Sequence, residues 1–255
     1  MPFEPVSPEK LSRGVVRQIE LLILRGILRP GERLPSEREL SERMGVSRPS
    51  LREALAELQE AGLLASRAGS GVFVADVLGS AFSPALVRLF SAHDEAVSDS
   101  IAFRRDMEGM AVERAAQVGS DTDLKVINAI FGQMQKAHAR RDDEKETAFD
   151  AEFHLSIMEA SHNVIMLHMM RSMYDLLRGG VFYNRQMIFR QPDTRQKLFD
   201  QHAAINDALQ ARDSAGARRA VEAHFDFVEE TLQAERKMVR NEAIAAKRLE
   251  HATGK

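Results

Sequence analysis

The sequence predicts a mainly α-helical protein in two parts: a small N-terminal part of three helices and a β-hairpin, and a larger C-terminal antiparallel bundle of helices. Three observations support this fold class. The 255 residues suggest two modest domains rather than one. Before residue 77, helical patterns are followed by two short apolar runs around a small-residue turn. From 96 to 240 the apolar spacing is helical almost throughout, and we find no strand pattern there.

The N-terminal part opens with two helix signals. Apolar residues at helical spacing predict a helix over residues 9–27, which Pro30 and Gly31 end. Ser36, with Glu39 three residues later, has the pattern of a capping box. We therefore expect a short second helix from this cap to about Met44.

A tight turn and a further N-cap at Ser47 start the third helix. Pro49 falls in its first turn, where proline is tolerated, and Gly62 ends it. The apolar runs 63–67 and 72–75 then predict a short hairpin. Helix, short helix, turn, helix and hairpin in this order are the arrangement of a winged helix-turn-helix.

In that arrangement the second helix of the pair enters the major groove of DNA. Here it begins with Ser47, Arg48, Pro49, Ser50, Leu51 and Arg52, which offers two hydroxyls and two guanidinium groups. Arginine can bond guanine bidentately, and serine can bond bases or phosphates. An ordinary amphipathic helix with solvated arginines explains the same residues. Residues 1–78 carry 11 Lys/Arg and 11 Asp/Glu, so DNA binding would require the basic groups to lie on one face.

Composition points to a cytoplasmic protein without a membrane partner. The hydrophobic share is 44% and the charged share 29%, as in soluble globular proteins. Cysteine is absent, so no disulfide is expected. The first residues lack the pattern of a signal peptide, and no apolar run approaches the roughly 20 residues that span a bilayer.

Four polar residues interrupt apolar helical stripes in the C-terminal part. Asp150 and His154 share one helix face, and His202 and His224 each lie in a later stripe. Burying these groups unpaired would be unfavourable, and a shared metal ion removes that penalty. One carboxylate with three imidazoles suits a divalent ion such as zinc. Three separate core histidines, each bonded to a backbone carbonyl, are the alternative.

Arg104 also interrupts an apolar stripe. A guanidinium that faces a helical interior needs an anion, and a small carboxylate ligand would fit it bidentately. An ion pair with Glu108, four residues later on the same helix, would serve equally well.

The N-terminal motifs resemble a known family. PGERLPSERELSERMGVSRPSLREALAELQEAGLL followed by GSGVFV is similar to the winged helix domain of GntR-type transcriptional regulators, over about residues 9–76. The resemblance implies that this protein regulates transcription as a homodimer on palindromic double-stranded operator DNA. It implies DNA contacts at the following positions: Arg38, Ser47, Arg48, Ser50, Arg52 and, at the tip of the wing, Gly69.

The C-terminal part resembles the FCD ligand-binding domain of the FadR subfamily. RRDMEGMAVERAA, DAEFHLSIMEASHN, DQHAAINDAL and AHFDFVEE match its signatures. The resemblance implies an effector-binding role for Arg104. It also implies that Asp150, His154, His202 and His224 hold one divalent metal ion, with zinc as the first candidate and nickel, iron or manganese as alternatives.

Within the subfamily the chain is similar to regulators of pyruvate dehydrogenase and of lactate or glycolate use. This implies control, as a repressor, by a small 2-hydroxy or 2-keto carboxylate such as lactate, glycolate or pyruvate. We find no HExxH, GxSxG or phosphate loop and expect no enzymatic activity. A metal-dependent enzyme and a helical bundle with a purely structural metal are the competing hypotheses.

These features divide the chain into four segments. We expect a DNA-binding domain at 1–77, a linker with one short helix at 78–95, the effector-binding bundle at 96–240 and a charged, fraying tail at 241–255.

Overall fold

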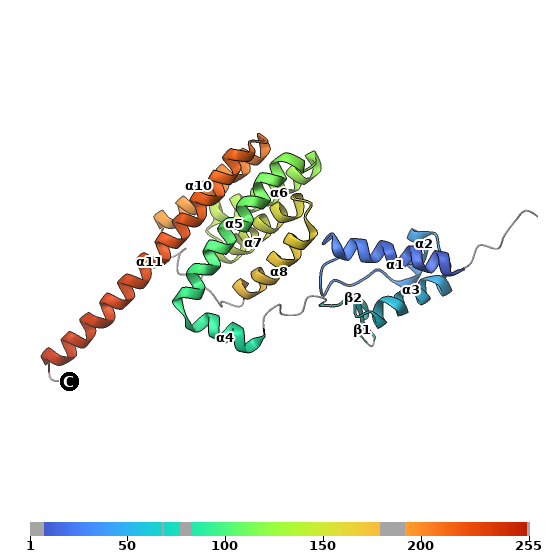
Figure 1. Cartoon of the computed structure of the whole chain (residues 1–255), viewed down its shortest axis with the longest axis horizontal. Helices are drawn as coiled ribbons and strands as arrows, with labels where there is room; N and C mark the ends of the chain where they lie inside the picture. The colour runs from blue at the N-terminus through green and yellow to red at the C-terminus, as the bar shows by residue number, and fades with distance from the viewer. Residues whose placement is uncertain (1–7, 68, 77–82, 179–191, 254–255) are drawn as a thin grey trace, which may run out of the picture. The chain divides into compact units, whose positions relative to one another are not determined.

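The computed structural model describes residues 8–67, 69–76, 83–178 and 192–253. Contacts divide the chain into two compact units, Met1–Ala81 and Phe82–Lys255, which we call the N-terminal and C-terminal units. Figure 1 shows the helices and strands of each unit.

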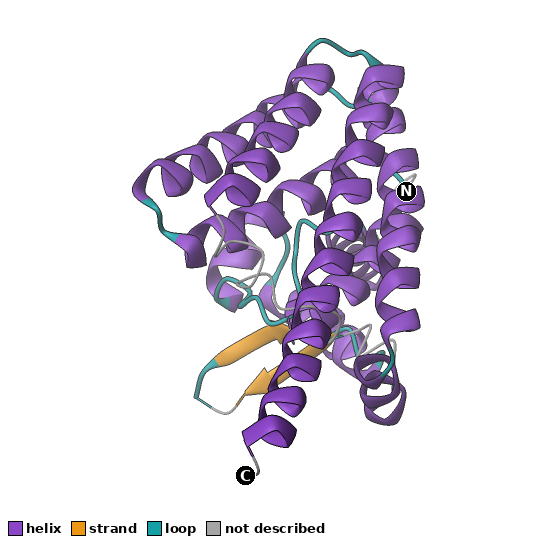
Figure 2. Cartoon of the chain, turned by 90° about the vertical axis from the view of Figure 1, so that its left-hand side faces the viewer, coloured by secondary structure: helices purple, strands orange, loops and turns teal. Residues whose placement is uncertain are grey.

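The N-terminal unit is a winged helix-turn-helix. Two antiparallel strands follow three helices, and they are the orange arrows of Figure 2. Leu64 lies opposite Val74 and Arg67 opposite Gly71 in this hairpin. The predicted order of elements is confirmed, and the bounds are α1 Pro8–Leu24, α2 Glu37–Met44, α3 Arg48–Glu60, β1 Leu64–Arg67 and β2 Gly71–Val74.

Two serine caps begin the helices of the helix-turn-helix. The Ser36 hydroxyl accepts a hydrogen bond from the Glu39 amide, and the Ser47 hydroxyl accepts one from the Ser50 amide, both at 3.3 Å. Each bond satisfies an amide that has no partner within the helix. Gly45 ends α2 in a left-handed conformation (φ 64°), which glycine adopts without strain. These local contacts place the start of α3 where the sequence predicts it.

The described part of the C-terminal unit contains seven helices and no strand. A short helix lies where the sequence indicates one in the linker, and the predicted break at Gly179 and Gly180 lies outside the described residues. In the described segments, no helix combines the length and the apolar character that a membrane span requires. The helices are α4 Pro84–Ala92, α5 Asp94–Val118, α6 Asp121–Arg140, α7 Asp143–Ala160, α8 Val164–Arg178, α10 Pro192–Gln210 and α11 Ser214–Thr253.

Contacts between the long helices show an antiparallel bundle. Arg105 on α5 pairs with Asp226 on α11, and Glu113 on α5 pairs with Arg218 on α11. Residue numbers therefore increase along α5 where they decrease along α11, so the two helices are antiparallel. Asn128 with Asn206, and Leu124 with Gln210, relate α6 to α10 in the same way. The bundle encloses one apolar core whose most buried large side chains include Phe153, Met158, Ile205 and Phe225.

The end of α11 lies in the segment predicted as a charged tail. α11 continues to Thr253, through most of the charged segment 241–255, and residues 237–253 are exposed. The segment contains no Gly or Pro before Gly254, and Ala, Glu, Lys and Arg make up most of it. These residues have high intrinsic helix propensity, and a folded helix already precedes them.

Candidate functional site

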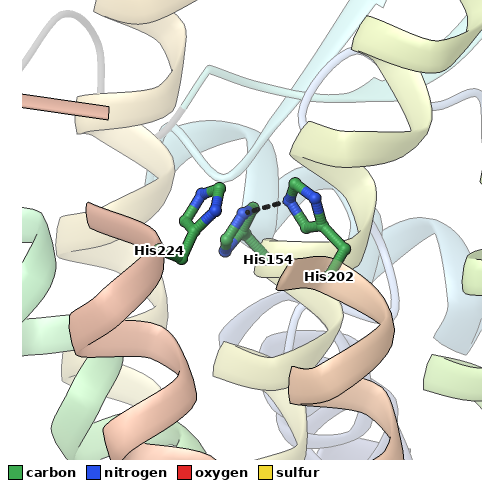
Figure 3. A group of neighbouring side chains, drawn as sticks. All are labelled: His154, His202 and His224. Carbon is green, nitrogen blue, oxygen red and sulfur yellow. Dashed lines mark hydrogen bonds between the residues drawn. The ribbon is translucent and has the colours of Figure 1, made fainter. Parts of the chain in front are cut away.

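Three histidines from three helices converge inside the C-terminal unit (Figure 3). His154 comes from α7, His202 from α10 and His224 from α11, and each is at most 2% exposed. One ring nitrogen of each lies within 4.8 Å of those of the other two. The fourth predicted ligand joins them, because an Asp150 oxygen is 3.1 Å from His202 Nε2. The structure therefore brings the three predicted histidine ligands together and places Asp150 beside one of them.

The opposite nitrogen of each ring lies close to an oxygen atom, by hydrogen bonds for His202 and His224 and at ion-pair distance for His154. His154 Nδ1 is 2.6 Å from Glu108 Oε2, His202 Nδ1 is 2.7 Å from the Leu198 carbonyl, and His224 Nδ1 is 3.1 Å from Gln201 Oε1. An acceptor at Nδ1 places the ring proton there and leaves the Nε2 lone pair available. The Nε2 atoms of His154 and His202 lie 3.1 Å apart. This contact is a hydrogen bond when one of the two nitrogens carries the proton (dashed line in Figure 3), and with both protons on Nδ1 the two facing lone pairs fit a divalent cation between them.

Glu108 carries the local charge that orients His154. Burial by itself would raise the pKa of Glu108, but the charge of Arg104 and the contacts with His154 and Tyr174 lower that pKa to about 2. Burial lowers the pKa of His154, against the opposing effect of Glu108. At neutral pH the pair is therefore an ionised carboxylate beside a neutral imidazole, the form in which histidine binds metal.

Arg104 lies beside this cluster and is 1% exposed. Its Nε donates to Glu108 Oε1 at 2.8 Å, and one terminal nitrogen donates to the Tyr174 hydroxyl at 2.8 Å. The guanidinium also stacks over the ring of Phe225, 4.7 Å from its centroid. The ion pair between Arg104 and Glu108 within α5 is thus present, and it places the Arg104 guanidinium next to the histidines.

Sequence reasoning missed three contributors to this site. Glu108 was considered only as a partner of Arg104, although its place in the same buried stripe was a usable signal. Tyr174 and Gln201 carried no such signal, because their contacts join helices that are distant in sequence.

The predicted DNA-contacting residues lie mostly on the surface of the N-terminal unit. Arg38 on α2 and Arg48 at the start of α3 are exposed, as is the N-cap Ser47. Gly69 is exposed in the turn of the wing with φ 72°. Arg52 is exposed and paired with Glu37 at 2.7 Å.

Ser50 differs from the other predicted DNA-contacting residues. Its side chain is 5% exposed, and its hydroxyl lies 2.9 Å from that of Ser47. This contact reinforces the N-cap of α3, so Ser50 has a structural role in the free protein.

A winged helix-turn-helix joined to an all-helical unit is the architecture of a DNA-binding transcriptional regulator. The profile described as "Bacterial regulatory proteins, gntR family" matches residues 11–74, and that of the FCD domain matches residues 99–227. The chain belongs to the GntR family and, by its FCD domain, to the FadR subfamily. Proteins of this family regulate transcription and are not enzymes.

Two curated relatives come from Escherichia coli (strain K12). The putative L-lactate dehydrogenase operon regulatory protein is 36% identical, over 89% of this chain and 88% of its own. The Glc operon transcriptional activator is 32% identical, over 86% of this chain and 87% of its own. Among solved structures, Streptococcus agalactiae GntR has a TM-score of 0.50 at 23% identity, covering 88% of this chain and all of that one, and thus shares the fold.

Proposed function

We propose that this protein is a repressor whose affinity for operator DNA is controlled by a small 2-hydroxy or 2-keto carboxylate, such as lactate, glycolate or pyruvate, bound at a divalent metal. The main support is geometric. Three imidazole nitrogens and a carboxylate converge next to the buried guanidinium of Arg104. The name of one curated relative, the putative L-lactate dehydrogenase operon regulatory protein, fits this effector class.

Asp150, His154, His202 and His224 would hold the ion in this proposal. Zinc is the first candidate, with nickel, iron or manganese as alternatives, because imidazole with one carboxylate suits these ions. When bound, the ion supplies a Lewis acid that a carboxylate and its adjacent oxygen can chelate. Arg104 supplies the fixed positive charge that neutralises the remaining carboxylate charge.

DNA recognition would use two copies of the chain. One recognition helix reads only a few base pairs, so a homodimer on a palindrome is the expected form. We assign DNA binding to residues 1–77 and effector binding to residues 96–240, joined by 78–95. An effector changes operator affinity only if it binds the two arrangements of these domains with different affinities.

Effector binding should weaken operator binding by about 5- to 150-fold, the usual range of an allosteric coupling. L-lactate, glycolate and pyruvate are screened by thermal shift with and without EDTA, and the stabilising acids are then added to an operator titration. Arg104→Gln keeps a donor for Glu108 but removes the charge, so this variant should retain metal and DNA binding while losing the response. An operator titration that none of a broad set of small carboxylates moves would contradict the proposed effector class.

The contacts of Arg104 favour a second candidate role for the site, in which the metal is purely structural and Arg104 binds no effector. Its bonds to Glu108 and Tyr174 already satisfy much of the guanidinium within the protein. A bundle with a purely structural metal would have the same contacts. In that case the Arg104→Gln variant and the wild type would respond identically to every acid tested.

A further inference from the structure

Glu108 makes contacts with two functional groups at once. Its Oε2 is 2.6 Å from Nδ1 of His154, and its Oε1 accepts from Arg104 Nε at 2.8 Å and from the Tyr174 hydroxyl at 3.0 Å. The side chain is 1% exposed. A single buried carboxylate on α5 therefore connects the candidate metal ligand on α7 with the candidate effector-binding arginine and with α8.

These contacts require a side chain whose two terminal atoms both accept hydrogen bonds, as the two oxygens of a carboxylate do. Arg104 can donate but cannot accept, so a glutamine at position 108 would have to present its carbonyl to the arginine. Its amide NH₂ would then face His154 Nδ1. The imidazole would have to accept that bond and carry its proton on Nε2, the nitrogen that faces His202. A protonated Nε2 cannot bind a metal ion.

We propose that Glu108 is the positioning residue that couples effector binding at Arg104 to the metal centre, an inference that rests on the proposed function above. An effector carboxylate that bonds Arg104 competes with Glu108 Oε1. The negative charge then concentrates on Oε2 and strengthens its bond to His154 Nδ1. Stronger bonding at Nδ1 makes Nε2 a better ligand. Because binding linkage is reciprocal, the metal raises effector affinity by the same factor.

The chain offers a chemically matched control at Glu146. This carboxylate is 3% exposed, accepts from Arg195 Nε at 2.8 Å and lies 2.8 Å from His138 Nδ1. It joins an arginine to a histidine as Glu108 does. His138 Nε2, however, is bonded to Gln196 at 3.1 Å and lies outside the candidate metal centre.

The test compares Co²⁺ binding by the full-length wild type, Glu108→Gln and Glu146→Gln, because Co²⁺ reports its ligands in its visible spectrum. Glu108→Gln should lower Co²⁺ affinity by about 10- to 100-fold and alter the absorption bands. L-lactate should raise Co²⁺ affinity by a larger factor in the wild type than in this variant, where only direct chelation of the ion remains. Glu146→Gln should lower the melting temperature while keeping the wild-type spectrum, Co²⁺ affinity and lactate effect.

Glu108→Asp covers the case in which Glu108→Gln does not fold. It retains the charge but is one methylene shorter, so it cannot reach both partners, and its lactate effect on Co²⁺ affinity should also be smaller than that of the wild type. Wild-type affinity, spectrum and lactate effect in either folded Glu108 variant would overturn the inference. A wild-type protein that binds no Co²⁺ would instead overturn the proposed function. Loss of Co²⁺ affinity in Glu108→Gln without any lactate effect in the wild type would support the positioning role and overturn the coupling.

Discussion

Alanine in place of His202 should abolish stoichiometric metal binding and lower the melting temperature of the C-terminal unit by about 8–16 °C. An ion that binds only the native state stabilises it by about 4 kcal/mol when its free concentration is a thousandfold above the dissociation constant. For a unit of this size each kcal/mol shifts the melting temperature by about 2–4 °C. His202 is 3.1 Å from both His154 and Asp150, so its loss removes the central ligand of the cluster.

Elemental analysis and melting curves with and without EDTA test this expectation. EDTA should bring the wild type down to the melting temperature of His202→Ala and leave that variant unchanged. His138→Ala is the matched control, because His138 also bonds a buried carboxylate but lies outside the cluster. It should lose some stability and keep its metal. A purified wild type that contains no metal, and gains no stability when zinc is added, would refute the metal centre.

Alanine in place of Arg48 should weaken binding to the cognate operator by about 5- to 150-fold. This range corresponds to about 1–3 kcal/mol for a lost bidentate contact to a base. Arg48 is exposed at the first position of α3, next to the N-cap that orients the helix. Arg52→Ala should have a smaller effect, because the Arg52 guanidinium is paired with Glu37 in the free protein and DNA must compete for it.

Titrations on operator and on scrambled DNA at several salt concentrations separate a base contact from a phosphate contact. Loss of a base contact lowers specific affinity alone, whereas loss of a phosphate contact lowers both and reduces the salt dependence. Arg17→Ala, which removes an exposed arginine from α1, serves as the control and should leave specificity intact. Unchanged operator affinity in both the Arg48 and Arg52 variants would remove α3 from the recognition surface.

The N-terminal fold was predictable because its signals are local. Ser36 and Ser47 each cap a helix through an amide three residues later, so the sequence itself shows both helix starts. The burial of individual polar side chains was harder to predict from the sequence. Ser50 carries a hydroxyl beside two arginines, which suggests DNA contact, yet its position faces Ser47 and the interior.

The candidate metal ligands were predictable because each interrupts an apolar stripe, and a polar residue in a core requires a partner. The sequence does not say which partner. Glu108 lies four residues from Arg104 on one helix, which predicts their ion pair, but its bond to His154 spans 46 positions and depends on how α5 packs against α7. The same applies to Tyr174, whose contact with Arg104 joins residues 70 positions apart.

Among the described residues of the C-terminal unit, the surface-exposed end of α11 is open to proteases. Lys237, Arg240, Lys247 and Arg248 all lie within residues 237–253, where every side chain is exposed. Trypsin cleaves unfolded backbone, and helix ends open more readily than buried segments. Digestion within the described helices should therefore begin by trimming α11 back toward Arg240. The trimmed product would retain His224 and every other candidate ligand, and mass spectrometry of a timed digest would reveal its new C-terminus.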